Sequence, residues 1–275
     1  MPVISTNTAA NAALNYLNIN SANETESISQ LASGSRIVQA KDDAAGLAIG
    51  TQLQANVTVF QQDQVNVSQG TSILQSTDGA LAQISNVLSR MLALATESAS
   101  GQVTNNQRTQ DINTEYQQLR GEIGSIVKST TYAGNALLTG SFLSNVKFLI
   151  GTQSTDFISV SLATVSATGL LGKTGSTVAS ASAALRAIGG VNSAIQTITK
   201  DRALVGAYES QFNFSGQDIA TNVQNISAAQ SVIMDADVAQ VKSSLSAQDV
   251  KTQAAIAALT QASQLPQELL HLLQS

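Results

Sequence analysis

The side chains that usually perform catalysis or bind metals are nearly absent from this chain of 275 residues. It has no cysteine and a single histidine, His271, close to the C-terminus. A serine–histidine–aspartate triad, a histidine general base or a histidine-ligated metal would all have to use that one residue. We interpret His271 as a terminal residue without a catalytic role.

Two other motifs could suggest chemistry. The stretch GKTGST (172–177) resembles a phosphate-binding loop, but the glycine that this motif requires further upstream is missing. Asp235 and Asp237 are two positions apart, so on a helix they do not face each other. They are better suited to the positive end of a helix dipole. We therefore expect no enzyme activity, no cofactor and no metal.

The overall charge excludes further classes. Charged residues make up 11% of the chain and the formal net charge is −5. A chain with so few charged residues and a net negative charge cannot neutralise a row of phosphates, so we expect no nucleic-acid partner. No apolar run is long enough to cross a bilayer, and the N-terminus lacks the charged and apolar regions of a signal peptide. We expect no membrane insertion and no cleaved signal peptide.

The spacing of apolar residues predicts long helices. Prolines occur only at positions 2 and 266, so nothing between them forces a helix to stop. Residues at alternating steps of four and three predict a coiled-coil seam near the N-terminus, although two of its positions are polar; the seam positions are Ala10, Leu14, Leu17, Ser21, Glu24, Ile28 and Leu31.

The same periodicity continues along the chain. It predicts one helix over about 44–100, another over 105–129, and a long helix that resumes near Val205 and persists almost to the C-terminus. Two β-prone runs in 146–162 predict a hairpin, and residues 166–177 read as a loop. The fold class is mainly α, with long antiparallel helices forming a terminal coiled coil and a helical bundle that carries a small β-hairpin insert. We assign 1–40 and 236–275 to the coiled-coil domain, with the first and last helices side by side, and 41–235 to the bundle.

The stretch RIVQAKDDAAGLAIG (36–50) combines two aspartates with a run of very small residues. Either Asp42 or Asp43 is placed to cap the helix that begins near Ala44. The small residues after it would let another backbone approach closely. We also interpret this stretch as a polar joint that takes part in contacts between molecules.

These blocks resemble the bacterial flagellin family. LASGSRIVQAKDDAAGLAI (31–49) is similar to the family's signature, and the resemblance extends through TYAGNALLTG (131–140), FLIGTQSTDFISVSL (148–162) and the segment that begins MDADVAQ (234–240). It covers nearly the whole chain and resembles a minimal flagellin without large outer domains. Gln30 and Val232 stand where the family usually carries arginine, so we do not carry over the salt bridges that those arginines would make at the joint.

The resemblance implies a secreted structural subunit that self-assembles into the extracellular bacterial flagellar filament. It implies partners of four kinds: identical subunits, a flagellar export chaperone, and the filament cap and hook-junction proteins. The weak, almost uncharged ends are expected to be disordered in the monomer and to order against neighbouring copies. The residues that we expect at self-assembly contacts are Leu14, Leu17, Ile28, Leu31, Arg36, Asp42, Asp43, Leu245, Ile256, Leu259 and Leu265.

A second site follows from the same resemblance. Arg90, Leu94 and Glu115 are similar to the flagellin surface bound by a Toll-like receptor, and Leu92 and Ala93 replace charged residues of strongly recognised members. Recognition is therefore expected to be weakened. Two alternatives to a filament subunit remain at this point: a hook–filament junction protein of the same family, and a helical translocator that inserts into host membranes.

Overall fold

A computed structural model describes the backbone of residues 7–139, 142–172 and 175–274, and the side chains of these residues as far as position 264. His271 and the Lys173–Thr174 pair of the GKTGST stretch therefore lie outside the described side chains. The chain forms two compact units: unit 1 comprises 1–56 and 225–275, and unit 2 comprises 57–224. The boundaries between the units fall within two long helices.

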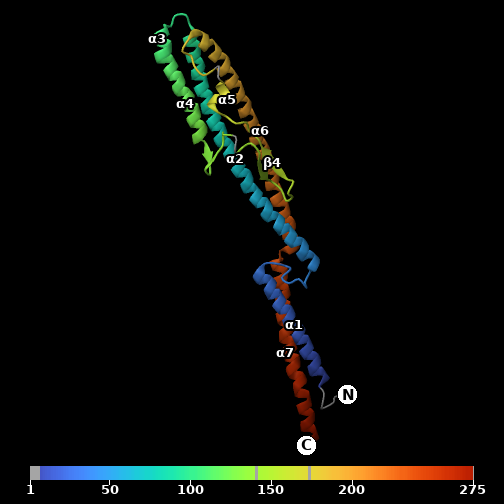
Figure 1. The fold of residues 1–275 in the computed structure, drawn as a ribbon. Helices are drawn as coiled ribbons and strands as arrows, with labels where there is room; N and C mark the ends of the chain where they lie inside the picture. Colours follow the sequence, from blue (N-terminus) through green and yellow to red (C-terminus); the bar gives the residue numbers. More distant parts are fainter. Residues whose placement is uncertain (1–6, 140–141, 173–174, 275) are drawn as a thin grey trace. The chain divides into compact units, whose positions relative to one another are not determined.

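Unit 1 contains a pair of antiparallel helices (Figure 1). Helix α1 spans Thr8–Ser33 and helix α7 spans Val238–Gln274, and the two pack against each other. The side-by-side arrangement of the first and last helices is thus confirmed. Unit 1 also holds the first turns of α2 (Ala44–Ala99) and the last turns of α6 (Ala181–Met234).

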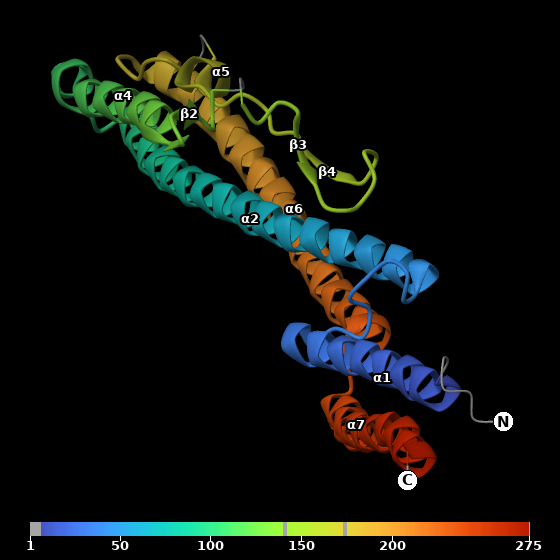
Figure 2. The ribbon, with the colours of Figure 1, turned by 90° about the horizontal axis from the view of Figure 1, so that it is seen from below.

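Unit 2 is a bundle in which α2 and α6 run alongside α4 (Asn113–Ser129) (Figures 1 and 2). The chain reaches α4 through α3 (Asn105–Gln107) and a π-helical turn, η1 (Arg108–Ile112). Long apolar side chains from the three long helices fill one continuous core. Its fully buried members include Leu74, Leu81, Leu88, Tyr116, Ile123, Ile198 and Phe212.

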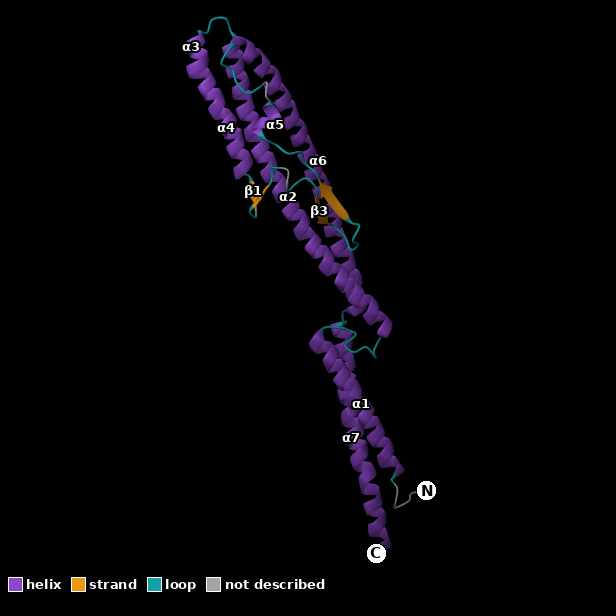
Figure 3. Ribbon diagram, viewed as in Figure 1, coloured by secondary structure: helices purple, strands orange, loops and turns teal. Residues whose placement is uncertain are grey.

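Two small antiparallel strand pairs lie against this bundle (Figure 3). Strands β1 (Thr131–Tyr132) and β2 (Asn135–Ala136) form a tight turn, whose Gly134 has φ +83°. Strands β3 (Val146–Leu149) and β4 (Phe157–Val160) form the predicted hairpin. The ring of Phe148 on β3 meets the ring of Phe212 edge-on at 5.2 Å. The hairpin is thereby anchored to the core through α6.

Position 70 makes room for that anchor. A Cβ on Gly70 would lie 2.6 Å from the Phe212 ring, so only glycine lets the ring pack against the α2 backbone. Gly79, nine positions further along α2, has no atom within 4 Å of its hypothetical Cβ. Gly70 and Gly79 therefore differ in role, and of these two only Gly70 is required by packing.

The structure corrects three local expectations. Residues 166–177 are not wholly a loop, because Ser166 caps a short helix, α5 (Ala167–Leu171), by accepting a hydrogen bond from the Gly169 N–H. The helix over 105–129 contains η1, which turns both Arg108 and Ile112 inward. The last long helix is broken between Met234 and Val238, where Ser35 and Asp235 form an antiparallel bridge. Backbone pairing with a distant segment competes there with the helix.

Candidate self-assembly surface

Helix α1 is bounded by local signals at both ends. The Asn7 side chain accepts a hydrogen bond from the Ala10 N–H at 3.0 Å and so caps the first turn. Its amide nitrogen also donates to the Ala262 carbonyl of α7 at 2.6 Å. Gly34 ends the helix in the left-handed conformation, with φ 70°. The length and position of α1 are therefore set partly by its own sequence and partly by α7.

The interface between α1 and α7 has the spacing of a coiled coil but few large apolar side chains. The buried or half-buried positions of α1 that follow coiled-coil spacing are Ala10, Ala13, Leu17, Asn20, Glu24, Ser27 and Leu31, and those of α7 include Val241, Leu245, Gln248, Thr252, Ala255, Leu259 and Ala262. Only two of the seven α1 positions carry leucine. Such a seam buries little apolar surface, so hydrophobic stabilisation of the pair is small.

Polar groups meet in the middle of this seam. The Ser27 hydroxyl donates to Oε1 of Gln248 at 3.5 Å, and the Thr252 hydroxyl donates to Oε2 of Glu24 at 3.3 Å. Hydrogen bonds of this kind add little net stability, because both partners give up water to make them. They fix the register of the two helices more than they hold them together.

Two large apolar side chains that the predicted register placed in the seam, Leu14 and Ile28, lie outside it, which corrects that register. Leu14 is 43% exposed and Ile28 is 51% exposed, and Ser21 is also exposed. The predicted and observed registers share Ala10, Leu17, Glu24 and Leu31, but the structure uses the small Ala13, Asn20 and Ser27 between them. Small side chains let the helices approach closely, and Ser27 gains a hydrogen-bond partner on α7.

This arrangement leaves apolar side chains that nothing within the described part of the molecule covers. Exposed aliphatic and aromatic side chains project from both helices of the pair. We call this set the outer face; its members are Leu14, Tyr16, Ile19 and Ile28 on α1, and Val250 and Ile256 on α7. Leu17, Leu31, Leu245 and Leu259 instead belong to the seam. Leu265 lies in α7, beyond the last described side chain.

The two aspartates of the joint have separate tasks. Asp43 caps α2, since its Oδ1 accepts the Gly46 N–H at 2.8 Å, which confirms the predicted cap. Asp42 instead closes the preceding turn, with its Oδ2 accepting the N–H groups of Val38 and Gln39 at 3.2 and 2.8 Å. Both carboxylates thus satisfy backbone donors that have no helical partner.

The small residues after Asp43 admit side chains rather than another backbone. A Cβ on Gly46 would lie 2.8 Å from Cδ1 of the buried Ile37. A Cβ on Gly50 would overlap the thioether of Met234 at the end of α6. The expectation of a close backbone crossing is therefore wrong in its detail: glycine here makes sockets for Ile37 and Met234.

Asp237 behaves as predicted and Asp235 does not. Oδ1 of Asp237 accepts the N–H groups of Ala239 and Gln240 at 3.0 and 3.1 Å, which caps α7. Asp235 instead accepts from the Ser231 hydroxyl at 2.6 Å, at the end of α6. It lies on the bridge to Ser35, so its side chain is not at the start of a helix.

Arg36 is held through its backbone rather than its charge. Its N–H donates to the Met234 carbonyl at 2.7 Å, and its own carbonyl accepts from the Gln30 side chain at 3.1 Å. Its side chain is exposed. The ion pairs among the described residues are Arg90–Glu115 and Arg202–Asp78, and neither lies in the joint.

The receptor-like residues do not form one exposed cluster. Arg90 and Glu115 are ion-paired at 2.7 Å, with 56% and 42% of their side chains exposed. Leu94 is only 2% exposed and belongs to the core of unit 2. Of the three, Arg90 and Glu115 are therefore available to a partner, and Leu94 is not.

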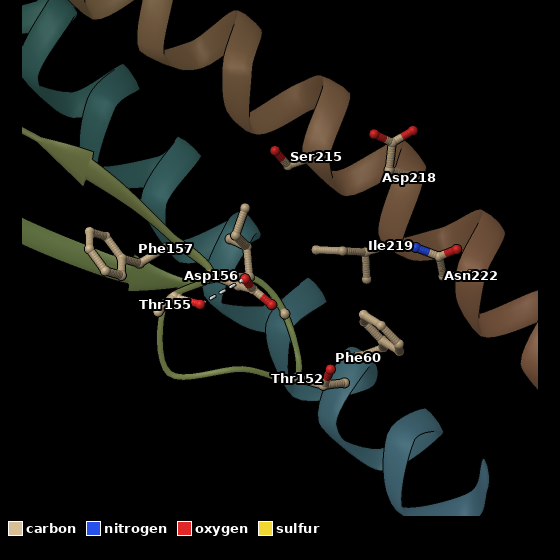
Figure 4. A pocket seen from close by; sticks show the side chains of 11 residues that line it. Phe60, Thr152, Thr155, Asp156, Phe157, Ser215, Asp218, Ile219 and Asn222 are labelled. Atoms are coloured by element: carbon tan, nitrogen blue, oxygen red, sulfur yellow. Dashed lines mark hydrogen bonds between the residues drawn. The ribbon is translucent and has the colours of Figure 1, made fainter.

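A polar hollow of about 480 Å³ lies between the hairpin loop, α2 and α6 (Figure 4). It is lined by Asp156, Asp218, several hydroxyl groups and the Phe60 ring. Asp156 is engaged in the loop itself, since its Oδ2 accepts the Gln153 N–H at 3.2 Å. No group of three or more histidine, cysteine or acidic side chains in the described part of the chain could hold a metal. We find no arrangement for catalysis in this hollow.

Comparison with known proteins identifies the class of molecule that this fold and surface define. The bacterial flagellin N-terminal helical region matches residues 4–142, and the bacterial flagellin C-terminal helical region matches residues 188–273. The chain belongs to the bacterial flagellin family. Flagellins are structural proteins of the flagellar filament and not enzymes, and the same holds for this chain.

Individual relatives span almost the whole chain. It is 32% identical to the flagellar filament 30.7 kDa core protein of Treponema maltophilum, over 98% of this chain and 99% of that protein. It is also 32% identical to the flagellin of Listeria monocytogenes, over 99% of both chains, and 31% identical to that of Bacillus subtilis, over 98% and 99%.

Solved structures agree on the fold. The crystal structure of Bacillus cereus flagellin superposes with a TM-score of 0.51 at 27% identity, covering 60% of this chain and 94% of that one. A putative flagellar hook-associated protein of Vibrio parahaemolyticus gives a TM-score of 0.58 at 14% identity, covering 70% and 99%. The second likeness shows a shared fold alone, and the hook-junction alternative gains no support from it. No helix among the described residues has an apolar stretch able to cross a bilayer, so the translocator alternative has no spanning segment there.

Proposed function

We propose that copies of this chain polymerise through the outer face of the α1–α7 pair. The observation that carries the proposal is the placement of Leu14 and Ile28 on the solvent side of a seam that is itself small and polar. An apolar stripe of this kind is stabilised when a neighbouring molecule covers it. A second copy of the chain presents Val250 and Ile256 of α7 as exposed apolar side chains that could meet it.

The proposed contact between copies can repeat from one copy to the next. A face on one copy that meets a different face on the next makes a heterologous contact, and such contacts generate open helical assemblies when the rotation does not close. We assign Leu14, Ile28 and Ile256 to the interface between copies. Leu17, Leu31, Leu245 and Leu259 act indirectly, by holding the pair in register. Arg36, Asp42 and Asp43 shape the joint that presents the pair.

The terminal helices are expected to gain order on assembly. The seam contributes so little apolar burial that the pair is marginal in a single molecule, and the surface covered by neighbours supplies the missing stabilisation. Weakly stable ends also suit transport through a narrow export channel. We propose that a flagellar export chaperone covers the outer face before export, and that the cap and hook-junction proteins meet the same face at the filament ends.

Recognition by a Toll-like receptor is proposed to be weak in this chain. Arg90 and Glu115 already neutralise each other at 2.7 Å, and Leu94 is buried. A partner would have to break the ion pair and would gain no contact with Leu94. A receptor-reporter assay with full response at low protein concentration would contradict this proposal.

The experiment that tests polymerisation compares two kinds of variant in α1. Leu14→Gln with Ile28→Asn removes the outer stripe, whereas Leu17→Gln damages the seam. Purified proteins are brought to salting-out conditions, and polymer is measured by sedimentation and electron microscopy. The outer-face variant is expected to keep the helicity of the monomer and to form no filaments. The seam variant is expected to lose helicity as well. Normal filaments from the outer-face variant would overturn the proposal.

A further inference from the structure

Met234, the last residue of α6, holds together three segments of unit 1. Its carbonyl accepts the Arg36 N–H at 2.7 Å and the Ser35 hydroxyl at 3.0 Å. One position further on, the Ala236 N–H donates to the Gly34 carbonyl at 3.0 Å. The link from α1 to α2 is therefore fastened to the link from α6 to α7 at this residue.

The side chain of Met234 makes a separate contact with α2. It lies so close to Gly50 that a Cβ at position 50 would be 2.6 Å from Cγ of Met234 and would overlap Sδ. Gly50 is buried under this thioether. The thioether thus packs directly on the backbone of Gly50, in a contact that any residue with a Cβ at position 50 would prevent.

The three methionines of the chain differ in their exposure. Met91 is completely buried in the core of unit 2, whereas Met234 is half-buried. Met1 lies outside the described residues. A small oxidant can therefore reach Met234 from solvent without unfolding of the bundle, and it cannot reach Met91 in that way.

We propose that Met234 is a peroxide-sensitive latch, and that its oxidation to the sulfoxide releases the joint between residues 34–37, the start of α2 and the end of α6. In this reaction a sulfur lone pair attacks one oxygen of hydrogen peroxide. An S–O bond forms and the O–O bond breaks, the sulfur loses two electrons, and the second oxygen leaves as water after proton transfer. The product is methionine sulfoxide, which is larger and polar.

The sulfoxide is a poorer partner for the Gly50 backbone than the thioether. It is larger, and its strong acceptor oxygen favours water over this apolar contact, since burying it without a donor carries a desolvation cost. The Met234 side chain must then leave the socket. Since the same residue carries the carbonyl that binds Arg36 and Ser35, its displacement strains those hydrogen bonds also. The inference concerns the joint within one molecule and stands apart from the polymerisation proposed above.

The test follows oxidation and backbone protection together in the full-length monomer. After hydrogen peroxide treatment, peptide mass spectrometry is expected to show sulfoxide at Met234 forming about tenfold faster than at Met91. Hydrogen exchange of the Arg36 and Ala236 amides should accelerate as the Met234 sulfoxide accumulates. Treatment with a methionine sulfoxide reductase should restore their protection.

Met234→Leu is the matched control, because leucine keeps an apolar side chain against Gly50 and cannot be oxidised. In this variant peroxide should leave the two amides protected. If the variant does not fold, the proposal is tested by the natural chain alone, through loss of amide protection on oxidation and its recovery on reduction. Equal oxidation rates at Met234 and Met91, or unchanged exchange after complete oxidation of Met234, would overturn the proposal.

Discussion

The Ser27 hydroxyl of α1 lies 3.5 Å from Oε1 of Gln248 on α7, at a level of the seam where a stable coiled coil would place two leucines. This Ser27–Gln248 contact is typical of the weak interactions that hold the two helices of unit 1 together. The helices find each other through small and polar groups, while Leu14 and Ile28 face outward. The stability of the pair should therefore respond to changes in the seam and not to equal changes on the outer face.

Replacing both seam residues tests that statement. The double variant Ser27→Leu with Gln248→Leu is expected to stabilise the α1–α7 pair by about 1–3 kcal/mol, because apolar area replaces a weak hydrogen bond. Ser21→Leu adds the same side chain at an exposed position and is expected to leave the monomer's stability unchanged. Thermal unfolding followed by circular dichroism measures both. Equal stabilisation by Ser21→Leu would show that Ser21 belongs to the seam, as the apolar spacing of the sequence predicted.

Gly70 and Gly79 of α2 give opposite predictions for one substitution. Gly79→Ala is expected to stabilise unit 2 by up to about 1 kcal/mol, since alanine is the better helix former and meets no atom within 4 Å. Gly70→Ala should destabilise it, because the new methyl group meets the Phe212 ring. Urea unfolding of the two variants checks the signs. A stabilised Gly70→Ala variant would show that Phe212 does not need the socket.

Two buried carboxylates predict how stability depends on pH. Asp63 and Asp201 are 1% and 5% exposed, and each has an Oδ2 atom without a hydrogen-bond partner. Burial raises the pKa of both groups; Asn66 lowers that of Asp63 and the charge of Asp156 raises it further, while Lys200 lowers that of Asp201. The folded pKa of each group therefore lies above its unfolded value. Their contribution to stability is complete below the unfolded pKa, near 4, and is lost as the pH rises through the folded pKa.

Neutral substitutions should remove this dependence. At pH 7, Asp63→Asn and Asp201→Asn are each expected to raise the stability of unit 2, by about 1 kcal/mol, because no buried charge remains. The advantage over the natural chain should shrink as the pH falls from 7 toward 4.5. Melting temperatures across this range provide the comparison. An advantage that stays constant with pH would show that the two carboxylates do not titrate differently on folding.

Arg90 and Leu94, two residues of the receptor-like site, are expected to contribute very differently to the free energy of unfolding. Arg90→Ala removes an exposed ion pair and is expected to change the free energy of unfolding by no more than about 1 kcal/mol. Leu94→Ala leaves a cavity in the core and should cost about 2–5 kcal/mol. Denaturant unfolding separates the two. A large destabilisation by Arg90→Ala would show that the ion pair is structural.

The long helices and the caps could be predicted from the sequence because they depend on local rules. The scarcity of proline and the regular apolar spacing are enough for α2, and Asp43 and Asp237 cap their helices through neighbouring N–H groups. The register of α1 could not be predicted. Two spacings share Ala10, Leu17, Glu24 and Leu31, and the observed one brings Ser27 to Gln248, more than two hundred residues away.

The same limit applies to the joint. Nothing local shows that Gly50 is a socket for Met234, or that residues 234–236 pair with residues 34–36 instead of continuing a helix. Both features result from packing between segments distant in the sequence. The π-helical turn at Arg108 is similar, since the Arg108 side chain donates to the Ser98 carbonyl at 2.7 Å from the opposite side of a turn.

Hydrogen exchange of the α1 and α7 amides, in dilute monomer and in polymer of the same protein, tests the central claim most directly. The account predicts rapid exchange along both helices in the monomer and strong protection in the polymer, with unit 2 protected in both. Full protection of α1 and α7 in dilute single molecules would contradict it, because the seam would then be sufficient without a neighbouring copy.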